Sequence, residues 1–339
     1  MRVKLEDVCE RGSSNLKQSD IIDASGDYPI YGASGYIGNV DFYHQDKPYV
    51  AVVKDGAGIG RTTLHPAKSS VIGTMQYLLP KENVLPEYLC YVVRYMHLEK
   101  YFTGATIPHI YFKDYKNEQF NLDTLEKQSE IMDILGKCER IIANREDELN
   151  KLDNLIKARF VEMFVSKNYP REDLDSLSLG KGEYGAQSAS TEYDSSRPRY
   201  VRITDINDDG SLNEDYVCSS NTDDDETYKL KYGDFCFARM GATVGKTYAY
   251  KSGNQIFAGY LIRYKLRLDK IIPEYLYEFT RLDEYRNWVL LNQSGAAQPG
   301  INAKKYGSLM IPVAPLEEQH KFAGFVKQVD KSKVIELAA

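Results

Sequence analysis

The sequence predicts an α+β chain in which long helices separate two similar globular domains. The chain repeats itself, each copy mixes short strand patterns with helix patterns, and each copy ends in a long-helix pattern. An antiparallel coiled coil is the expected arrangement of these two end helices, with the second one shortened. The expected boundaries are a first domain at 1–122, a central helix at 123–168, a second domain at 169–313 and a C-terminal helix at 314–339.

The internal repeat aligns without gaps over its best-matching part. Residues 104–135 and 295–326 share nine identities in 32 positions at an offset of 191. A shorter match, at an offset of 185, relates residues 56–61 to residues 241–246. The offset changes where loops differ in length, and the period is too long for a solenoid. A duplicated domain is therefore expected.

Strand and helix patterns recur in both copies. Runs rich in aromatic and β-branched residues, bounded by glycine turns, predict strands at residues 49–53, 200–203, 234–238 and 260–264. Pro86 and Pro273 mark helix starts, because proline suits the first helical position and an apolar stripe follows each. The acidic stretch at residues 205–225 predicts an exposed loop region.

The first long helix is the clearest single element. From Glu126 to about Phe164 there is no proline and one glycine, so about 39 residues predict a rod of roughly 58 Å. Asp123 or Thr124 is its expected N-cap. The second helix starts at Glu317 and has room for about 23 residues.

Apolar residues at heptad spacing predict a seam for a partner helix on both rods. The seam residues are Ile131, Leu135, Cys138, Ile142, Leu149, Leu152, Ile156 and Met163 in the first helix, and Phe322, Val326 and Val329 in the second. Lys333 interrupts the second seam. Because the second helix is short, most of the first seam, beyond about Arg145, is expected to lack an intramolecular partner and to be covered by another subunit or a second copy.

Bulk features exclude several classes of protein. The five cysteines are scattered and the five histidines show no ligand spacing, so neither a disulfide framework nor a structural metal is expected. The first seven residues are too charged for a signal peptide, and the longest apolar run, residues 88–93, is too short to cross a membrane. A cytoplasmic chain without membrane attachment is expected.

A Gly-x-x-x-Gly turn followed by a basic residue occurs in both copies. Gly241 to Thr247 resembles a phosphate-binding loop, but it has three residues between the glycines where that motif needs four, and a strand-like alternation follows it. We expect a hairpin instead, with a basic residue facing a phosphate or a base edge. No nucleophile elbow, amino-methyltransferase motif or nuclease-like carboxylate cluster is present, so no catalysis is expected.

Several short motifs together resemble the specificity subunit of type I restriction–modification systems. They are the run Tyr200-Val201-Arg202-Ile203-Thr204-Asp205-Ile206, the run Tyr28-Pro29-Ile30-Tyr31-Gly32-Ala33-Ser34-Gly35-Tyr36-Ile37-Gly38, and Leu316-Glu317-Glu318-Gln319 after Pro312 and Pro315. The resemblance covers nearly the whole chain. The first copy departs from the family pattern at residues 121–124, which contain no proline.

This resemblance implies two target-recognition domains that each read half of a split sequence in double-stranded DNA. The paired helices would act as a ruler and would dock two methyltransferase subunits, and a motor-nuclease subunit would join for cleavage. S-adenosylmethionine, ATP and magnesium would be held by those partners, and this chain would hold no cofactor. Self-association through the unpaired part of the coiled coil is a further expected interaction.

The expected DNA-facing residues belong to three kinds of segment. These are the two glycine loops with the residues just before them (residues 54–61 and 239–246), the two Gly-Ala segments at the start of the aligned repeat (residues 104–110 and 295–301), and the second-domain signature (residues 200–206). They are Lys54, Gly56, Gly60, Arg61, Thr106, His109, Arg202, Arg239, Gly241, Gly245, Lys246 and Gln298. Glutamine pairs well with adenine, and arginine with guanine. Residues 1–120 carry 13 basic and 14 acidic groups and residues 170–312 carry 18 and 21, so any DNA-binding face must be a local patch. The net charge of −6 favours an alternative, a bivalent protein-binding scaffold that dimerises through its coiled coil.

Overall fold

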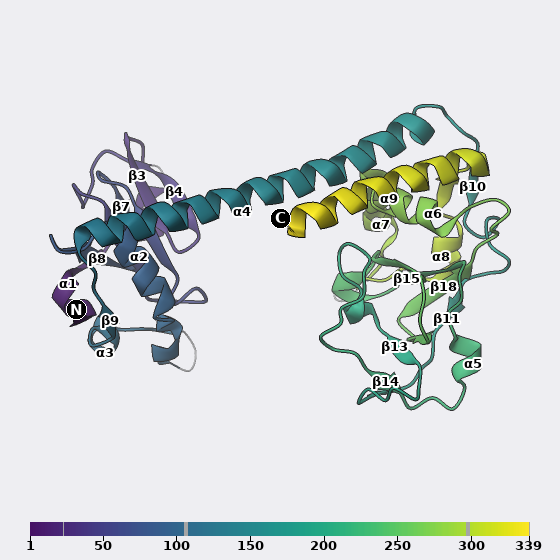
Figure 1. Cartoon of the computed structure of the whole chain (residues 1–339), viewed down its shortest axis with the longest axis horizontal. Coiled ribbons are helices and arrows are strands. Elements are labelled where there is room, and N and C mark those ends of the chain that lie inside the picture. Colours follow the sequence, from purple (N-terminus) through teal and green to yellow (C-terminus); the bar gives the residue numbers. More distant parts are fainter. Residues whose placement is uncertain (23, 105–107, 296–298, 339) are drawn as a thin grey trace. The chain divides into compact units, whose positions relative to one another are not determined.

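The structure, a computed structural model of the chain, describes residues 1–22, 24–104, 108–295 and 299–338. The chain divides into two compact units, Met1–Ala143 (unit 1) and Asn144–Ala339 (unit 2). The division falls inside the long helix α4 (Leu125–Phe160), because its first turns pack on the core of unit 1 and its last turns on the core of unit 2. Both units combine helices and sheets, so the predicted α+β class is confirmed (Figure 1).

Unit 1 is built on a four-stranded antiparallel sheet of order β2–β8–β5–β6. Its strands are β2 (Cys9–Ser13), β5 (Tyr49–Val53), β6 (Thr62–His65) and β8 (Met75–Pro80). The smaller sheets contain β1 (Arg2–Lys4) with β9 (Gln119–Asn121), and β4 (Gly35–Val40) with β3 (Tyr28–Gly32) and β7 (Ser70–Val71). The helical elements before α4 are α1 (Leu5–Val8), η1 (Gln18–Ile21), α2 (Pro86–Tyr95), η2 (Leu98–Tyr101) and α3 (Phe112–Tyr115).

Unit 2 repeats this plan with a four-stranded sheet of order β11–β18–β15–β16. Its strands are β11 (Glu183–Tyr184), β15 (Asp234–Ala238), β16 (Thr247–Ala249) and β18 (Leu261–Lys265). The remaining strands are β10 (Arg171–Asp173), β12 (Ser190–Thr191), β13 (Arg199–Val201), β14 (Ser219–Ser220), β17 (Gln255–Phe257) and β19 (Met310–Pro312). The helical elements are η3 (Val161–Val165), η4 (Ile203–Asp205), α5 (Asp225–Tyr228), η5 (Gly241–Thr243), α6 (Pro273–Thr280), α7 (Asp283–Asn292), α8 (Ala303–Gly307) and α9 (Leu316–Ala338).

The two units confirm the duplication in their central sheets. The sheets have the same strand order, and each unit adds one parallel strand pair, β3 with β7 and β13 with β17. β5 and β15 occupy the predicted ranges because every residue in them is buried, which gives continuous apolar runs in the sequence. Helices α2 and α6 begin at the predicted prolines.

A buried glutamine fixes each long helix to its own unit. Gln128 accepts a hydrogen bond from the Leu85 backbone at 2.8 Å and donates to the Asn83 carbonyl at 3.0 Å. Gln319 repeats this arrangement with Ile272 at 3.0 Å and Lys270 at 2.8 Å. A buried amide with its hydrogen bonds satisfied specifies one geometry. The recurring Leu-Glu-x-Gln motif is thus the anchor of the helix on the unit.

Within unit 2, α9 lies antiparallel to the C-terminal half of α4 (Figure 1). Ion pairs mark the two ends of the contact: Lys167 with Glu318 at 3.3 Å, and Asp153 with Lys333 at 2.8 Å. The predicted interruption of the seam by Lys333 is therefore compensated by a carboxylate on the facing helix.

The predicted seam residues fall into three environments. Ile131 packs on the core of unit 1, and Leu135 and Leu149 are half-buried. Leu152, Ile156 and Met163 pack in the core of unit 2 together with Phe322, Val326 and Val329. Cys138 and Ile142 are exposed, as are the neighbouring Ile134 and Ile141.

The expected position of the unpaired part of the seam is wrong. The sequence predicts an unpaired stretch beyond about Arg145, but α9 returns antiparallel and packs on that end of α4. A cluster of exposed apolar side chains lies instead before Arg145, at Ile134, Cys138, Ile141 and Ile142, which we call the α4 strip.

Candidate nucleic-acid interface

The two glycine loops are hairpin connections, as predicted. The first joins β5 to β6 and the second joins β15 to β16, and both strand pairs are antiparallel. The Val53 backbone donates to Arg61 at 2.9 Å and accepts from Gly60 at 2.9 Å. Ala238 makes the equivalent bonds with Lys246 at 2.8 Å and Gly245 at 3.0 Å. The loops therefore have one backbone design.

Glycine is required by this design because the backbone is left-handed at all four positions. The φ angles are +92° at Gly56, +81° at Gly60, +72° at Gly241 and +89° at Gly245. A Cβ at Gly60 would also lie 2.7 Å from the Glu99 backbone nitrogen. The second glycine of each loop thus permits close packing within the chain, while the first has open space around the position of a Cβ among the described residues.

Each loop is joined to the Gly-Ala segment of its own unit. Gly56 donates to the Pro108 carbonyl at 3.0 Å, and Gly241 to the Pro299 carbonyl at 2.9 Å. A second backbone hydrogen bond is also shared by the two units. The Ile110 nitrogen donates to the Lys54 carbonyl, and the Ile301 nitrogen to the Arg239 carbonyl, both at 2.9 Å. We call this hydrogen-bonded pair of segments the loop–segment framework. Of the predicted contacts, Thr106 and Gln298 lie outside the described residues.

In unit 1 the framework displays Lys54, Arg61 and His109. The His109 ring is hydrogen-bonded through Nδ1 to Asp55 at 2.5 Å, which ties the segment to the loop by side chains as well. Arg61 is exposed and donates to the Ala33 carbonyl at 2.9 Å. Beside it lies a groove of about 410 Å³ lined by the loop, Arg94 and Glu99.

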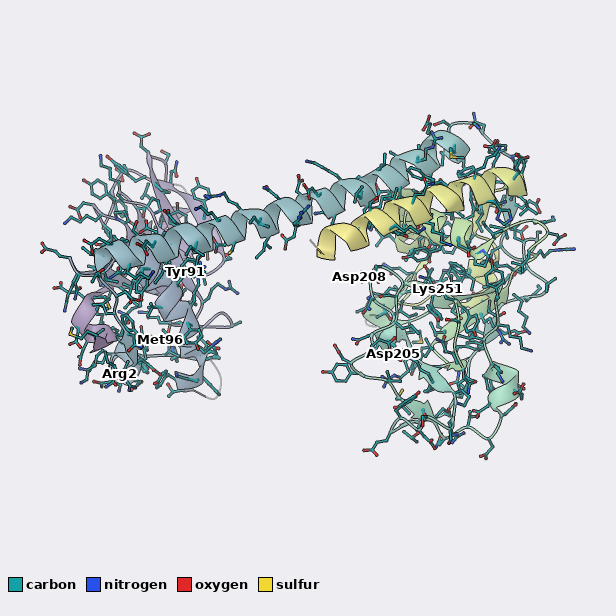
Figure 2. The ribbon with its side chains drawn as sticks, viewed as in Figure 1. Arg2, Tyr91, Met96, Asp205, Asp208 and Lys251 are labelled. Atoms are coloured by element: carbon teal, nitrogen blue, oxygen red, sulfur yellow. The ribbon has the colours of Figure 1, made fainter. Side chains whose placement is uncertain are left out.

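In unit 2 the framework displays Arg239 and Lys246. Lys246 lines a groove of about 750 Å³ together with both loop glycines, Arg281, Arg286 and Gln293. Its Nζ lies 2.7 Å from a carboxylate oxygen of Asp208 and donates to the Ile206 carbonyl at 3.2 Å. The Asp208 side chain, labelled in Figure 2, is almost fully exposed. Because the carboxylate end of this pair is in solvent, the pair is weak and can exchange for a phosphate.

Arg202 is engaged inside the chain. Its Nε and Nη2 bind the buried carboxylate of Asp205, and Nη2 also donates to the Tyr216 carbonyl at 3.1 Å. The signature run around Arg202 therefore contributes a structural ion pair. The prediction of an exposed loop region at residues 205–225 is therefore wrong for part of that stretch. Asp205, Ser219 and Ser220 are buried.

The resemblance of residues 241–247 to a phosphate-binding loop ends at the backbone. Such a loop opens a helix whose N-terminus faces the phosphate. Here Gly241–Thr243 form one 3-10 turn, and the next element is strand β16. In the described part of the chain, no group of three or more His, Cys, Asp or Glu side chains is arranged to hold a metal ion. No described helix is long and apolar enough to cross a membrane.

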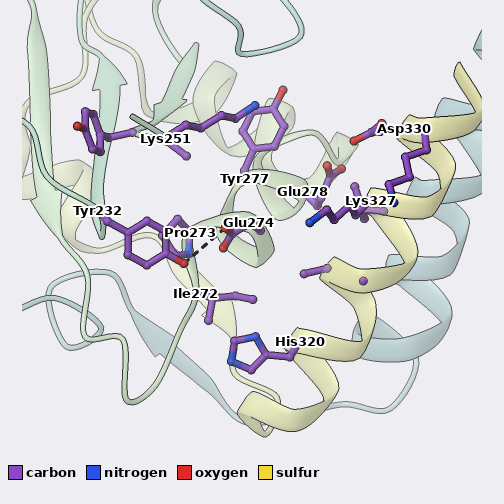
Figure 3. A pocket seen from close by; sticks show the side chains of 16 residues that line it. Tyr232, Lys251, Ile272, Pro273, Glu274, Tyr277, Glu278, His320, Lys327 and Asp330 are labelled. Carbon is purple, nitrogen blue, oxygen red and sulfur yellow. Dashed lines mark hydrogen bonds between the residues drawn. The ribbon is translucent and has the colours of Figure 1, made fainter. Parts of the chain in front are cut away.

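A second groove in unit 2, of about 950 Å³, lies between α6 and α9 (Figure 3). At its edge the Tyr232 hydroxyl donates to Glu274 at 3.5 Å. The buried Glu278 also lines this groove, and the nearest nitrogen of Arg281 lies 3.5 Å from its Oε2. Burial raises the pKa of Glu278 to about 7.

This buried carboxyl predicts a pH-dependent stability of unit 2. Because the folded-state pKa is raised from 4.5 to about 7, Glu278 stabilises the fold fully below pH 4.5 and loses that contribution as pH rises through 7. The Glu278→Gln variant should flatten the pH dependence in this window and be more stable at pH 8, by about 3 kcal/mol at most. Urea unfolding at pH 5 and pH 8 measures this. The prediction is contradicted if the unfolding free energy changes equally between pH 5 and pH 8 in both proteins.

Each of the two units carries its own copy of the loop–segment framework, so the chain is a duplicated protein with two equivalent candidate binding sites. The family model described as type I restriction modification DNA specificity domain matches residues 1–154 and 180–338. The chain therefore belongs to this family of specificity subunits of type I restriction–modification systems. No curated protein matches the chain in sequence.

Solved structures show the same fold. The chain is similar to the S subunit of a type I restriction–modification system from M. genitalium, with 14% identity, a TM-score of 0.61, and coverage of 100% of this chain and 91% of that one. It is also similar to a chain in a structure that describes complex assembly and conformational transition of the type I R-M system. That chain has 16% identity and a TM-score of 0.55, and the match covers 100% of this chain and 92% of that one.

Proposed function

We propose that the chain recognises a bipartite double-stranded DNA target, with each unit reading one half. The observation that carries this proposal is the repetition of one loop–segment framework, with a basic residue after its second glycine in both units. One rod-like helix between two readers selects half-sites at a matching spacing. The chain provides specificity without catalysis.

The chemistry then belongs to partner subunits. Two methyltransferase subunits with S-adenosylmethionine would modify adenine, and a motor-nuclease subunit with ATP and magnesium would cleave, all in the cytoplasm. The α4 strip supports a protein partner on the helix, because four exposed apolar side chains at helical spacing form one unpaired face. The net negative charge of the chain is compatible with DNA binding when the basic groups gather at the two frameworks.

Salt-dependent binding tests this proposal. We expect the chain with its methyltransferase subunit to shift a duplex carrying its motif in preference to a scrambled duplex. The Arg61→Ala/Lys246→Ala variant should bind at least roughly tenfold more weakly, and its slope of log affinity against log salt should be less steep by about two, one for each lost phosphate contact.

The matched control is Arg267→Ala, which removes an exposed cation of unit 2 that pairs with Asp269 after β18. It should leave affinity and slope unchanged. Equal binding by the double variant and the control would contradict the assignment of the loops. A complex without preference for any duplex would favour the protein-scaffold alternative.

A further inference from the structure

One side chain of the unit 2 framework is held by aromatic rings. The guanidinium carbon of Arg239 lies 5.0 Å from the centre of the Tyr184 ring and 5.6 Å from that of Tyr260. Its Nε donates to the Gly259 carbonyl at 3.1 Å. Tyr184 and Tyr260 are 43% and 54% exposed, so this cation sits at the surface of the unit. We call these three residues the arginine clamp.

The backbone of the clamp is fixed on both sides. Arg239 donates to the Tyr260 carbonyl at 3.0 Å and accepts from Ile301 of the Gly-Ala segment at 2.9 Å. Tyr184 is fixed as well, because its hydroxyl oxygen accepts a hydrogen bond from the Ala303 backbone at 3.3 Å. Ring contacts and the Nε bond restrict a side chain that otherwise loses much rotamer entropy on binding.

The described residues of unit 1 form no such clamp, although its backbone is equivalent. Lys54 takes the place of Arg239 and donates to the Thr74 carbonyl at 2.9 Å, so Thr74 corresponds to Tyr260. The sheet registers then place Ser13 where unit 2 has Tyr184, because Ser13 faces Gln76 as Tyr184 faces Ile262. The difference between the units at this position is therefore a flexible lysine against a planar, oriented guanidinium.

We propose that the arginine clamp reads one guanine through its major-groove edge. With Nε used by Gly259, the two terminal nitrogens have no hydrogen-bond partner in the described part of the chain. A planar pair of donors matches guanine O6 and N7 in a fixed orientation, whereas a lysine reaches the same acceptors from a flexible stem without that fixed geometry. Tyr184 and Tyr260 act as positioning residues. This inference rests on the proposed function, and it assigns a base to one half-site only.

Base analogues test the inference in the complex with the methyltransferase subunit. Each guanine of the methylated motif is replaced in turn by 7-deazaguanine, which lacks N7, or by inosine, which keeps both O6 and N7. The unaltered chain should lose about 5- to 150-fold in affinity at one guanine with 7-deazaguanine and retain its affinity with inosine there.

The variants connect that guanine to the clamp. Arg239→Ala should bind the guanine and 7-deazaguanine duplexes with the same, weakened affinity, and the charge-conserving Arg239→Lys should discriminate between them less than the unaltered chain. Tyr184→Leu/Tyr260→Leu should lower the discrimination at the same base, and Arg267→Ala should keep it in full. A motif without guanine would overturn the inference, and so would full discrimination between guanine and 7-deazaguanine by both Arg239 variants. A loss of affinity in Arg239→Ala that is equal whichever base is replaced would also overturn it, because such a loss marks a phosphate contact. A parent complex without preference for its motif over a scrambled duplex would overturn the proposed function itself.

Discussion

The Phe160→Ala variant should lose about 3–5 kcal/mol of unfolding free energy in unit 2. Phe160 is fully buried where α4, α6 and α9 meet. Its ring centre lies 4.9 Å from those of Phe164 and Tyr275, and 5.4 Å from that of Phe322. Removing the ring leaves a cavity at the point where α9 is held on α4.

Urea unfolding followed by tryptophan fluorescence measures this loss, because Trp288 is the single tryptophan and it packs on the same core. The control is Leu155→Ala on the same helix, where the side chain is 48% exposed and the expected loss is below about 1 kcal/mol. Similar midpoints for the two variants would show that Phe160 does not hold the helices together.

The Ile141→Asp/Ile142→Asp variant should lose binding to the methyltransferase subunit while keeping its fold. Both side chains are more than half exposed, so charging them costs little in the free chain. In a buried interface, two carboxylates without partners weaken association by tenfold or more. Calorimetric titration of the methyltransferase subunit measures the affinity.

Ala143→Asp/Asn150→Asp is the matched control, because these exposed residues lie on the opposite face of α4 and add the same two charges. It should bind like the unaltered chain. If the isoleucine variant binds the methyltransferase subunit as tightly as the unaltered chain, the α4 strip is not part of that interface. If the free chain forms weak dimers, and the control keeps them while the isoleucine variant loses them, the α4 strip is a self-association surface.

The sequence predicted those elements whose signals are local. β5 and β15 are continuous buried runs, and Pro86 and Pro273 start helices without tertiary help. The heptad pattern found much of the helix contact but missed Phe160 and Phe164, because it considers only a facing helix. The unit itself contributes Tyr275 to the same core, so the buried face of α4 is wider than a seam.

The candidate site was predictable in its parts and not in its assembly. The repeat identifies the glycine loops and Gly-Ala segments, but the bonds between them join residues 52 to 62 positions apart. The two rings around Arg239 belong to β11 and to the turn before β18, and no local pattern connects them. Asp205 beside Arg202 was readable from its i+3 spacing, which is typical of an ion pair at the start of a helical turn.

Sequencing of methylated adenines in cells that express the chain with its methyltransferase partner tests bipartite recognition most directly. We expect one motif of two specific parts with a gap of constant length. Lys54→Ala, in unit 1, should relax one part, and Arg239→Ala, in unit 2, should relax the other. A contiguous motif, or relaxation of the same part by both variants, would contradict the assignment of one reader to each unit.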